Sequence, residues 1–189
     1  TSDDGGLTWT GPVTVASGLG AVASAVNGQL VFQDKDYIAA DRFAGSSPFA
    51  GRAYVTWTSF QERSLPVGFV GRAPIMTSSS DDGAVWTAPR EISGFSEFCS
   101  KFNLRPDECD ENQDSYPTVA PNGRAYVSFE NFNTPAENQI MVVRSDDGGR
   151  SFSPPARVDT VFDINYPKNS DRRDTLTGCQ LRVSSVANS

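Results

Sequence analysis

The chain has 189 residues, a formal net charge of −7 and no histidine. Hydrophobic residues make up 38% of it and charged residues 21%, and 16 glycines and 12 prolines accompany only 2 methionines. This composition excludes a disordered chain and a coiled coil, and it predicts a turn-rich domain with a core of its own.

The charge balance also restricts function. An acidic chain without a stripe of lysine and arginine lacks the attraction on which nucleic-acid and anionic-membrane binding depend. No apolar run approaches the roughly 20 residues that cross a bilayer, so we expect no membrane insertion. The absence of histidine excludes Ser/His/Asp and Cys/His nucleophilic systems and argues against a zinc site.

One segment occurs three times along the chain. Residues 2–9, 79–86 and 145–152 share the pattern Ser-x-Asp-x-Gly-x-x-aromatic, and each copy continues into a proline-containing stretch. The aromatic residues of successive copies lie 77 and 66 residues apart, a spacing that suits a four-stranded propeller blade. The matched residues are Ser2, Asp4, Gly6 and Trp9, then Ser79, Asp81, Gly83 and Trp86, then Ser145, Asp147, Gly149 and Phe152.

Each residue type in this repeat has a structural role. A short carboxylate accepts hydrogen bonds from nearby backbone N–H groups, glycine permits the positive φ of a tight hairpin, and the hydroxyl closes the same network. We expect Trp9, Trp86 and Phe152 to occupy equivalent buried positions beneath their hairpins. The regular recurrence of the aspartates favours turn capping over metal ligation or catalysis.

Two longer segments also resemble each other, and both alternate like half-buried strands. They are residues 51–60 and 123–132. Strands are predicted before them and after them, at residues 37–40, 74–77, 116–119 and 139–143. Each unit then reads strand, strand, strand, repeat, strand.

The repeats divide the chain into units. Residues 1–15 are predicted to form the last hairpin of one blade, 16–92 and 93–158 two complete blades, and 159–189 the start of another. Closed propellers need roughly four to eight blades, so we expect the remaining blades to come from the same polypeptide or from neighbouring subunits. The predicted fold class is all-β, a partial β-propeller of four-stranded antiparallel blades.

These repeats resemble the Asp box, or bacterial neuraminidase repeat, of the sialidase-like β-propellers. Residues 36–41 and the strand 51–60 are similar to the secreted bacterial exo-α-sialidase-like branch, in which a motif like residues 176–183 introduces a further blade. The resemblance implies a secreted, extracytoplasmic protein. Because Asp boxes also occur in propellers without sialidase activity, it implies an architecture rather than a chemistry.

Sialidases of this kind bind the substrate carboxylate through three arginines, attack through a tyrosine activated by a glutamate, and use an aspartate as acid/base. The Arg-Ile-Pro type motif of the first arginine is absent, and Arg72-Ala73-Pro74 is the nearest look-alike. No catalytic residue is therefore assigned. The candidate ligand-binding residues are Arg72, Arg182, Tyr37 and Tyr116, the alternatives being surface arginines and tyrosines packed in the core or the channel.

Cys99 and Cys109 enclose a charged, glycine-free loop with few apolar residues. A disulfide would hold such a loop together. It would also place the protein outside the cytoplasm, because reducing compartments do not keep structural disulfides. Cys179 is left over, either free or paired elsewhere.

Carboxylates gather in two places. Asp34, Asp36 and Asp41 are candidate ligands for Ca²⁺, with solvated loop carboxylates as the favoured alternative. The acidic run 107–114 is expected to be a solvated insertion, the alternative being a cation or partner site. No other cofactor is predicted.

Three functions remain open. The favoured one is a secreted, non-catalytic propeller segment that acts as a glycan- or protein-binding or assembly module. The alternatives are a fragment of an exo-α-sialidase or related glycoside hydrolase, and a structural subunit of an extracellular complex. We do not expect enzyme activity from this segment alone, because the catalytic groups of a sialidase must assemble around one channel.

Overall fold

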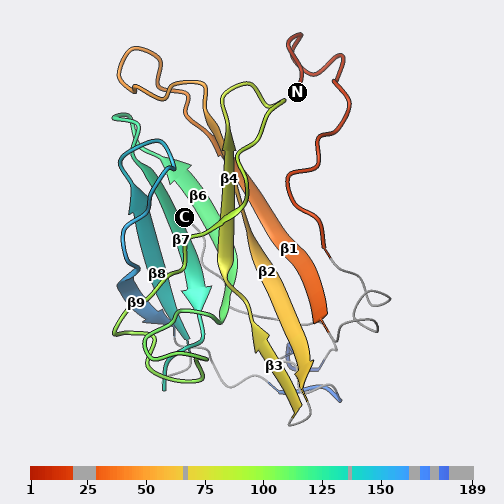
Figure 1. Ribbon diagram of the computed structural model, residues 1–189, viewed down its shortest axis with the longest axis vertical. Coiled ribbons are helices and arrows are strands. Elements are labelled where there is room, and N and C mark those ends of the chain that lie inside the picture. Colours follow the sequence, from red (N-terminus) through yellow and green to blue (C-terminus); the bar gives the residue numbers. More distant parts are fainter. Residues whose placement is uncertain (19–28, 66–67, 136–137, 162–166, 171–174, 179–189) are drawn as a thin grey trace.

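The computed structural model describes residues 1–18, 29–65, 68–135, 138–161, 167–170 and 175–178. Its regular elements are strands, arranged in two antiparallel sheets that lie side by side (Figure 1). No helix occurs in these ranges, and thus none that could span a membrane. The predicted all-β, antiparallel class is confirmed.

The first sheet has the strand order β1-β2-β4-β5, and β3 pairs with the far end of β2. Its strands are β1 (Gln29–Ala40), β2 (Ala53–Leu65), β3 (Gly68–Arg72), β4 (Ile75–Ser80) and β5 (Arg90–Glu91). Because β3 and β4 pair with successive parts of β2, they act together as one interrupted third strand. The second repeat forms the connection from β4 to β5.

The second sheet has the order β6-β7-β8-β9. Its strands are β6 (Asn112–Val119), β7 (Ala125–Asn131), β8 (Asn138–Ser145) and β9 (Ala156–Val161). The third repeat forms the connection from β8 to β9. Both sheets are thus antiparallel meanders in which a repeat joins the third strand to the last.

The first strand of each sheet carries a β-bulge at the same place. The pairing shifts just before Tyr37 in β1 and just before Tyr116 in β6. Lys35 and Asp114, within these bulges, have φ of 55° and 54°, which few residues with a side chain adopt. Lys35 Nζ lies 2.8 Å from Asp114 Oδ1, and the two tyrosine rings lie 5.3 Å apart. The bulges therefore join one sheet to the other.

The strand β6 brings the second sheet against the first, because it contacts β1, β2 and β4. Alternation along β7 buries Val127 and Phe129, and burial of such side chains stabilises a fold by about 1.5–3 kcal/mol each. The core cluster consists of Ile75, Ile92, Cys99, Cys109, Val127, Phe129, Met141 and Val143.

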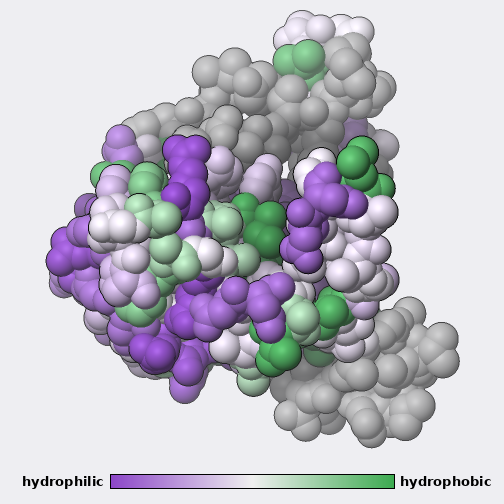
Figure 2. All heavy atoms as spheres, turned by 90° about the horizontal axis from the view of Figure 1, so that it is seen from above, coloured by the Kyte–Doolittle hydropathy of each residue, from purple (hydrophilic) through white to green (hydrophobic). Residues whose placement is uncertain are grey.

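All three repeats form turns at the same end of the molecule, the upper end in Figure 1. We call residues 2–9, 79–86 and 145–152 the first, second and third repeat turns. Figure 2 looks onto this end, where hydrophilic side chains cover most of the surface and hydrophobic patches are separate.

Candidate functional site between the repeat turns

The first and third repeat turns are closed by the same hydrogen bonds. Gly6 N donates to Ser2 Oγ at 2.8 Å, and Ser2 Oγ donates to Asp4 Oδ1 at 2.8 Å. Thr8 donates to the Asp4 carboxylate from its backbone N at 2.9 Å and from its Oγ1 at 2.6 Å. The equivalent network of the third turn involves Ser145, Asp147, Gly149 and Ser151.

These hydrogen bonds keep both carboxylates ionised. The bonds from Thr8, above all the one from its side chain, lower the pKa of Asp4 to about 2. Burial raises the pKa of Asp147, but hydrogen bonds from Ser151 and Ser145 outweigh it and the pKa falls to about 2. A general acid needs a pKa near the working pH, so these groups suit turn capping rather than proton transfer.

The second turn departs from the predicted assignment by one residue. Ser80, rather than Ser79, accepts from Gly83 N at 2.7 Å and donates to Asp82 Oδ1 at 3.1 Å. Asp82, rather than Asp81, accepts from two backbone N–H groups of the turn, both at 2.8 Å. The assignment of Ser79 and Asp81 to this network is therefore wrong.

Two assignments fit the sequence because serine and aspartate are each doubled at residues 79–82. Strand pairing selects one of them, since Ala53 pairs with Ser80 as Ala125 pairs with Ser145. In this alignment every turn begins Ser-Asp-Asp-Gly, and the second turn is one residue shorter because it lacks a second glycine. The shared glycines have φ of 73°, 71° and 72° and are Gly5, Gly83 and Gly148.

The remaining aspartate of the second turn, Asp81, pairs with an arginine at the start of β2. Arg52 Nε and Nη2 lie 2.7 and 2.9 Å from the two carboxylate oxygens of Asp81, a bidentate geometry. In the second sheet Arg124 Nε lies 2.7 Å from Asp146 Oδ1. Both arginines belong to the repeated Gly-Arg-Ala-Tyr sequence, which is the signal that could have revealed this pair.

Arg52 also joins the two sheets. Its Nη1 donates to Gly148 O at 2.7 Å, and its guanidinium lies 5.5 Å from the ring centroid of Phe49. A Cβ added at Gly148 would lie 2.6 Å from Arg52 Nη1 and 2.7 Å from the Phe49 ring. The third turn can therefore approach this closely only with glycine here. We call Arg52, Asp81 and Gly148 the arginine clasp.

The contact between successive turns recurs as well. A Cβ added at Gly83 would strike Thr1 Cγ2, and one added at Gly149 would come within 3.8 Å of Ser79 Oγ. Thr1 and Ser79 each stand directly before the serine of their own turn. Each turn thus lies against the residue that precedes the turn before it.

The aromatic residues of the turns are less buried than predicted. Trp9 is 73% exposed, and Trp86 and Phe152 are half-buried. The indole N–H groups of Trp9 and Trp86 donate to Gly6 O and Gly83 O, both at 3.1 Å. The expectation of three equivalent buried positions is wrong because burial depends on what lies beneath each turn. Phe152 packs on the core cluster, and Trp9 has no such cluster within the described chain.

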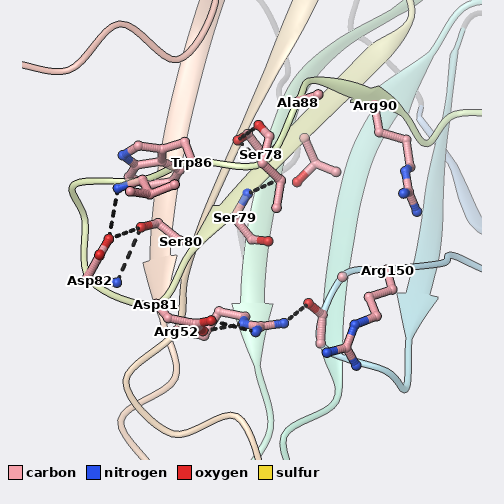
Figure 3. Close-up of a pocket in the computed structure, with 15 residues that line it drawn as sticks. Arg52, Ser78, Ser79, Ser80, Asp81, Asp82, Trp86, Ala88, Arg90 and Arg150 are labelled. Atoms are coloured by element: carbon pink, nitrogen blue, oxygen red, sulfur yellow. Dashed lines mark hydrogen bonds and ion pairs between the residues drawn. The ribbon is translucent and has the colours of Figure 1, made fainter.

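A cleft of about 430 Å³ lies between the second and third repeat turns (Figure 3). Trp86 borders it on one side, and Arg90 of β5 and Arg150 of the third turn border it on the other. The clasp residue Arg52 lies along the lower edge in this view. The sequence did not single out this site, because its borders come from both sheets.

The charged side chains that border the cleft sum to one positive charge, because Arg52, Arg90 and Arg150 outnumber Asp81 and Asp82. Asp81 neutralises Arg52, and backbone hydrogen bonds of its own turn lower the pKa of Asp82 and keep that carboxylate negative. Arg90 is exposed, and Arg150 donates to Asp147 O of its own turn at 3.5 Å. Neither Arg90 nor Arg150 has an ion pair with any described residue.

Hydroxyl groups line the cleft between these charges. Ser78 Oγ donates to Thr87 O at 2.7 Å, and Thr87 Oγ1 accepts from Ser79 N at 3.0 Å. Ser79 Oγ makes no hydrogen bond with another described residue. The serine that the turn network does not use thus borders the cleft, although Ser79 is only 8% exposed.

The predicted ligand-binding residue Arg72 lies in a different place, in an ion-pair network. Its Nη2 lies 2.7 Å from Glu91 Oε1 and 2.9 Å from Glu108 Oε1. Arg105 reaches the same Glu108 at 2.6 Å and lowers the pKa of that carboxyl. Arg72 therefore neutralises a buried carboxylate.

The other predicted ligand-binding residues are only partly described. Tyr37 and Tyr116 contact each other at the two bulges, and Tyr37 is 51% exposed. Arg182 lies outside the described residues, as does Cys179.

The predicted disulfide between Cys99 and Cys109 is present, and both cysteines are completely buried. Buried amides lie beside it. Asn131 Nδ2 donates to Asn112 Oδ1 and to Asn133 Oδ1, both at 2.8 Å. This network attaches the disulfide loop to β7.

The acidic run 107–114 is packed against the protein and is not the solvated insertion expected. Glu108 and Asp110 are 1% and 0% exposed, because Asp110 accepts hydrogen bonds from Leu104 N at 2.7 Å and Asn133 Nδ2 at 2.8 Å. Burial, aided by the charge of Asp110, raises the pKa of Glu111 to about 7.

Two of the three candidate Ca²⁺ ligands accept hydrogen bonds from backbone groups near them in the chain. Asp34 Oδ1 accepts from Lys35 N at 2.9 Å, and Asp41 Oδ1 accepts from Phe43 N at 3.1 Å. Within the described ranges, no group of three or more Asp, Glu, Cys or His side chains is placed to hold a metal ion.

Comparison with known proteins adds little. No family model matches the chain, and no curated protein matches it. The chain is similar to a solved structure of a protein of unknown function from Dyadobacter fermentans, with 16% identity and a TM-score of 0.37. The match covers 74% of this chain and 42% of that one. At this TM-score the likeness indicates neither a fold family nor a function.

Proposed function

We propose that this chain is part of a sialidase-like β-propeller and acts as a non-catalytic, extracytoplasmic module that binds a glycan between its second and third repeat turns. The remaining blades come from the same polypeptide or from neighbouring subunits.

The propeller architecture is supported by relations that recur from one sheet to the next. Both sheets have the same strand order, the same bulge and the same arginine–aspartate pair. The residue directly before the serine of one turn also lies against a glycine of the next turn, Thr1 against Gly83 and Ser79 against Gly149. Sheets that follow one another in a constant relation build a ring or an array.

The observation that carries the binding function is the cleft between two neighbouring sheets. It combines one aromatic side chain, two guanidinium groups without an ion pair among the described residues, hydroxyls and the carboxylates of Asp81 and Asp82 in about 430 Å³. Ligand sites are typically concave, lie between structural units and combine an apolar surface with a few placed polar groups. A glycan offers hydroxyls to such polar groups and C–H faces to an indole.

A non-catalytic role fits the surroundings of Arg72. A sialidase directs its arginines at the substrate carboxylate, whereas Arg72 is directed at Glu91 and Glu108. The buried disulfide fits an extracytoplasmic location, since reducing compartments do not maintain such bonds.

A glycan array probed with three proteins tests the binding function. Ala88 follows the second repeat turn, is exposed and borders the cleft, whereas Ala84 is exposed within that turn and does not border the cleft. We expect the parent protein and the Ala84→Trp variant to bind the same subset of glycans, and Ala88→Trp to lose them because the indole fills the cleft. Absence of any bound glycan, or equal binding by both variants, would refute the proposal.

A fluorogenic sialoside tests the non-catalytic part. We expect turnover at the level of buffer alone for the parent protein. Turnover by the parent that disappears in Arg72→Ala would instead identify a sialidase fragment.

A further inference from the structure

We infer that the cleft selects a saccharide with an isolated carboxylate, such as one hexuronic acid unit in a mostly neutral oligosaccharide. Arg90 and Arg150 hold the carboxylate, and Trp86 contacts the sugar ring. This inference rests on the proposed glycan-binding function and specifies its ligand.

The two arginines reach the border of the cleft from different elements. Arg90 comes from β5 of the first sheet and Arg150 from the third repeat turn, and both border the cleft opposite Trp86 (Figure 3). Guanidinium groups match a carboxylate with two parallel N–H···O bonds. Neither arginine has an ion pair with a described carboxylate, although the charge of Arg150, after that of Arg52, helps to lower the pKa of Asp81. A ligand carboxylate therefore breaks no ion pair when it binds either guanidinium.

Trp86 is fixed in place before any ligand arrives. Its Nε1 donates to Gly83 O at 3.1 Å, so the indole N–H is already satisfied and the ring holds one orientation. A ring that is half-buried and borders the cleft offers an apolar surface to the C–H groups of a sugar. A preorganised contact costs little conformational entropy on binding.

The net charge of the chain favours a ligand of low charge density. The chain carries a net charge of −7, which repels polyanions such as nucleic acids or heavily sulfated glycans. At physiological ionic strength this repulsion is screened beyond about 8 Å. A single carboxylate that enters the cleft is therefore attracted by the two nearby arginines, against the repulsion of Asp82.

Binding is measured by calorimetry with three oligosaccharide probes. The first contains one glucuronic acid unit, the second is its carboxyl-reduced form with the same ring but no charge, and the third is a heparin-derived fragment. We expect the acidic probe to bind at least about tenfold more tightly than its reduced form, because charge-assisted hydrogen bonds are lost on reduction. The heparin fragment is expected to bind more weakly than the first probe.

Variants assign the effect to residues. Arg90→Gln and Arg150→Gln are each expected to weaken binding of the acidic probe about tenfold and to leave the affinity for the reduced probe unchanged. Arg42→Gln is the matched control. Arg42 is exposed in the loop before β2, and its guanidinium lies over Phe43 outside the cleft. The Arg42→Gln variant removes one positive charge, as the other two variants do, without changing a residue of the cleft. Urea unfolding of each variant shows whether it is folded.

The outcomes separate this inference from the proposed function. If the acidic and reduced probes bind equally, or if Arg42→Gln matters as much as Arg90→Gln, glycan binding stands and carboxylate selection is refuted. If the heparin fragment binds most tightly of the three probes, the preference for a ligand of low charge density is refuted. If neither a neutral nor an acidic saccharide binds, the proposed function itself fails.

Discussion

The same arginine has different surroundings in the two sheets. The Arg52 side chain is 15% exposed and bonds both to Asp81 and to the third repeat turn above it. The Arg124 side chain is 47% exposed, like that of its partner Asp146, and no turn covers it within the described residues. The second sheet is instead held from its opposite end, by the disulfide loop.

This difference shows that the repeated motif determines the shape of a turn but not its contribution to stability. Exposed ion pairs contribute about 0–1 kcal/mol. A covered arginine that also donates to a backbone carbonyl contributes more, because its removal leaves a desolvated acceptor without a partner. Stability therefore depends on which neighbour covers the turn.

The largest loss of stability is expected at the glycine whose neighbours lie closest. Gly148→Ala places a Cβ against Arg52 and Phe49 at positive φ, and we expect it to lower the free energy of unfolding by about 2–4 kcal/mol. Gly5→Ala is the control, because Gly5 has nearly the same φ, 73° against 72°, but nothing within 4 Å. It should cost about 1 kcal/mol. Equal losses in urea unfolding would mean that the clasp is not tightly packed.

Removal of the disulfide tests the support of the second sheet. The pair Cys99→Ser with Cys109→Ser opens a link between residues 10 apart in sequence and should cost about 2–3 kcal/mol. Native-state hydrogen exchange should accelerate in β7, where the amide network attaches, more than in β2. Uniform acceleration across both sheets would show that the disulfide does not support one sheet in particular.

Truncation of the two arginines measures the comparison directly. Arg52→Ala removes the bonds to Asp81 and Gly148, and we expect a loss of about 1–3 kcal/mol in urea unfolding. Arg124→Ala removes only an exposed pair and should cost less than about 1 kcal/mol. If both variants lose the same free energy of unfolding, coverage of Arg52 by the third repeat turn does not contribute to stability.

The smallest effect tests the corrected assignment of the second turn. Ser80 makes the turn hydrogen bonds, so Ser80→Ala should cost about 1 kcal/mol. Ser79→Ala should stay within about 0.5 kcal/mol, because its hydroxyl has no partner among the described residues. Thermal unfolding compares the two variants. A lower midpoint for Ser79→Ala than for Ser80→Ala would restore the assignment made from the sequence.

The strands and their order could be predicted because alternation and repetition are local properties of a sequence. Residues 51–60 and 123–132 show both, and they lie largely within β2 and β7. The disulfide was predictable for a similar reason, since the loop that it closes has few apolar residues of its own. The interruption between β3 and β4 was not foreseen.

The site could not be predicted, because it depends on contacts between distant segments. Arg90 and Arg150 belong to different sheets, and only the packing of the sheets brings both to one cleft. The assignment of Asp81 failed for another reason. The doubled serine and aspartate matched the repeat in two ways, and pairing between Ala53 and Ser80 was needed to choose. The exposure of Trp9 likewise depends on what lies beneath it.

The second repeat turn is shorter than the other two by one residue, and it supplies Trp86 to the border of the cleft. A protein built from copies of one unit keeps its scaffold in the copies that stay alike. One copy is then free to diverge during evolution and acquire a task of its own. Insertion of a glycine after Gly83 would give the second turn the length of the other two, and such a variant offers a route to a scaffold without a ligand site.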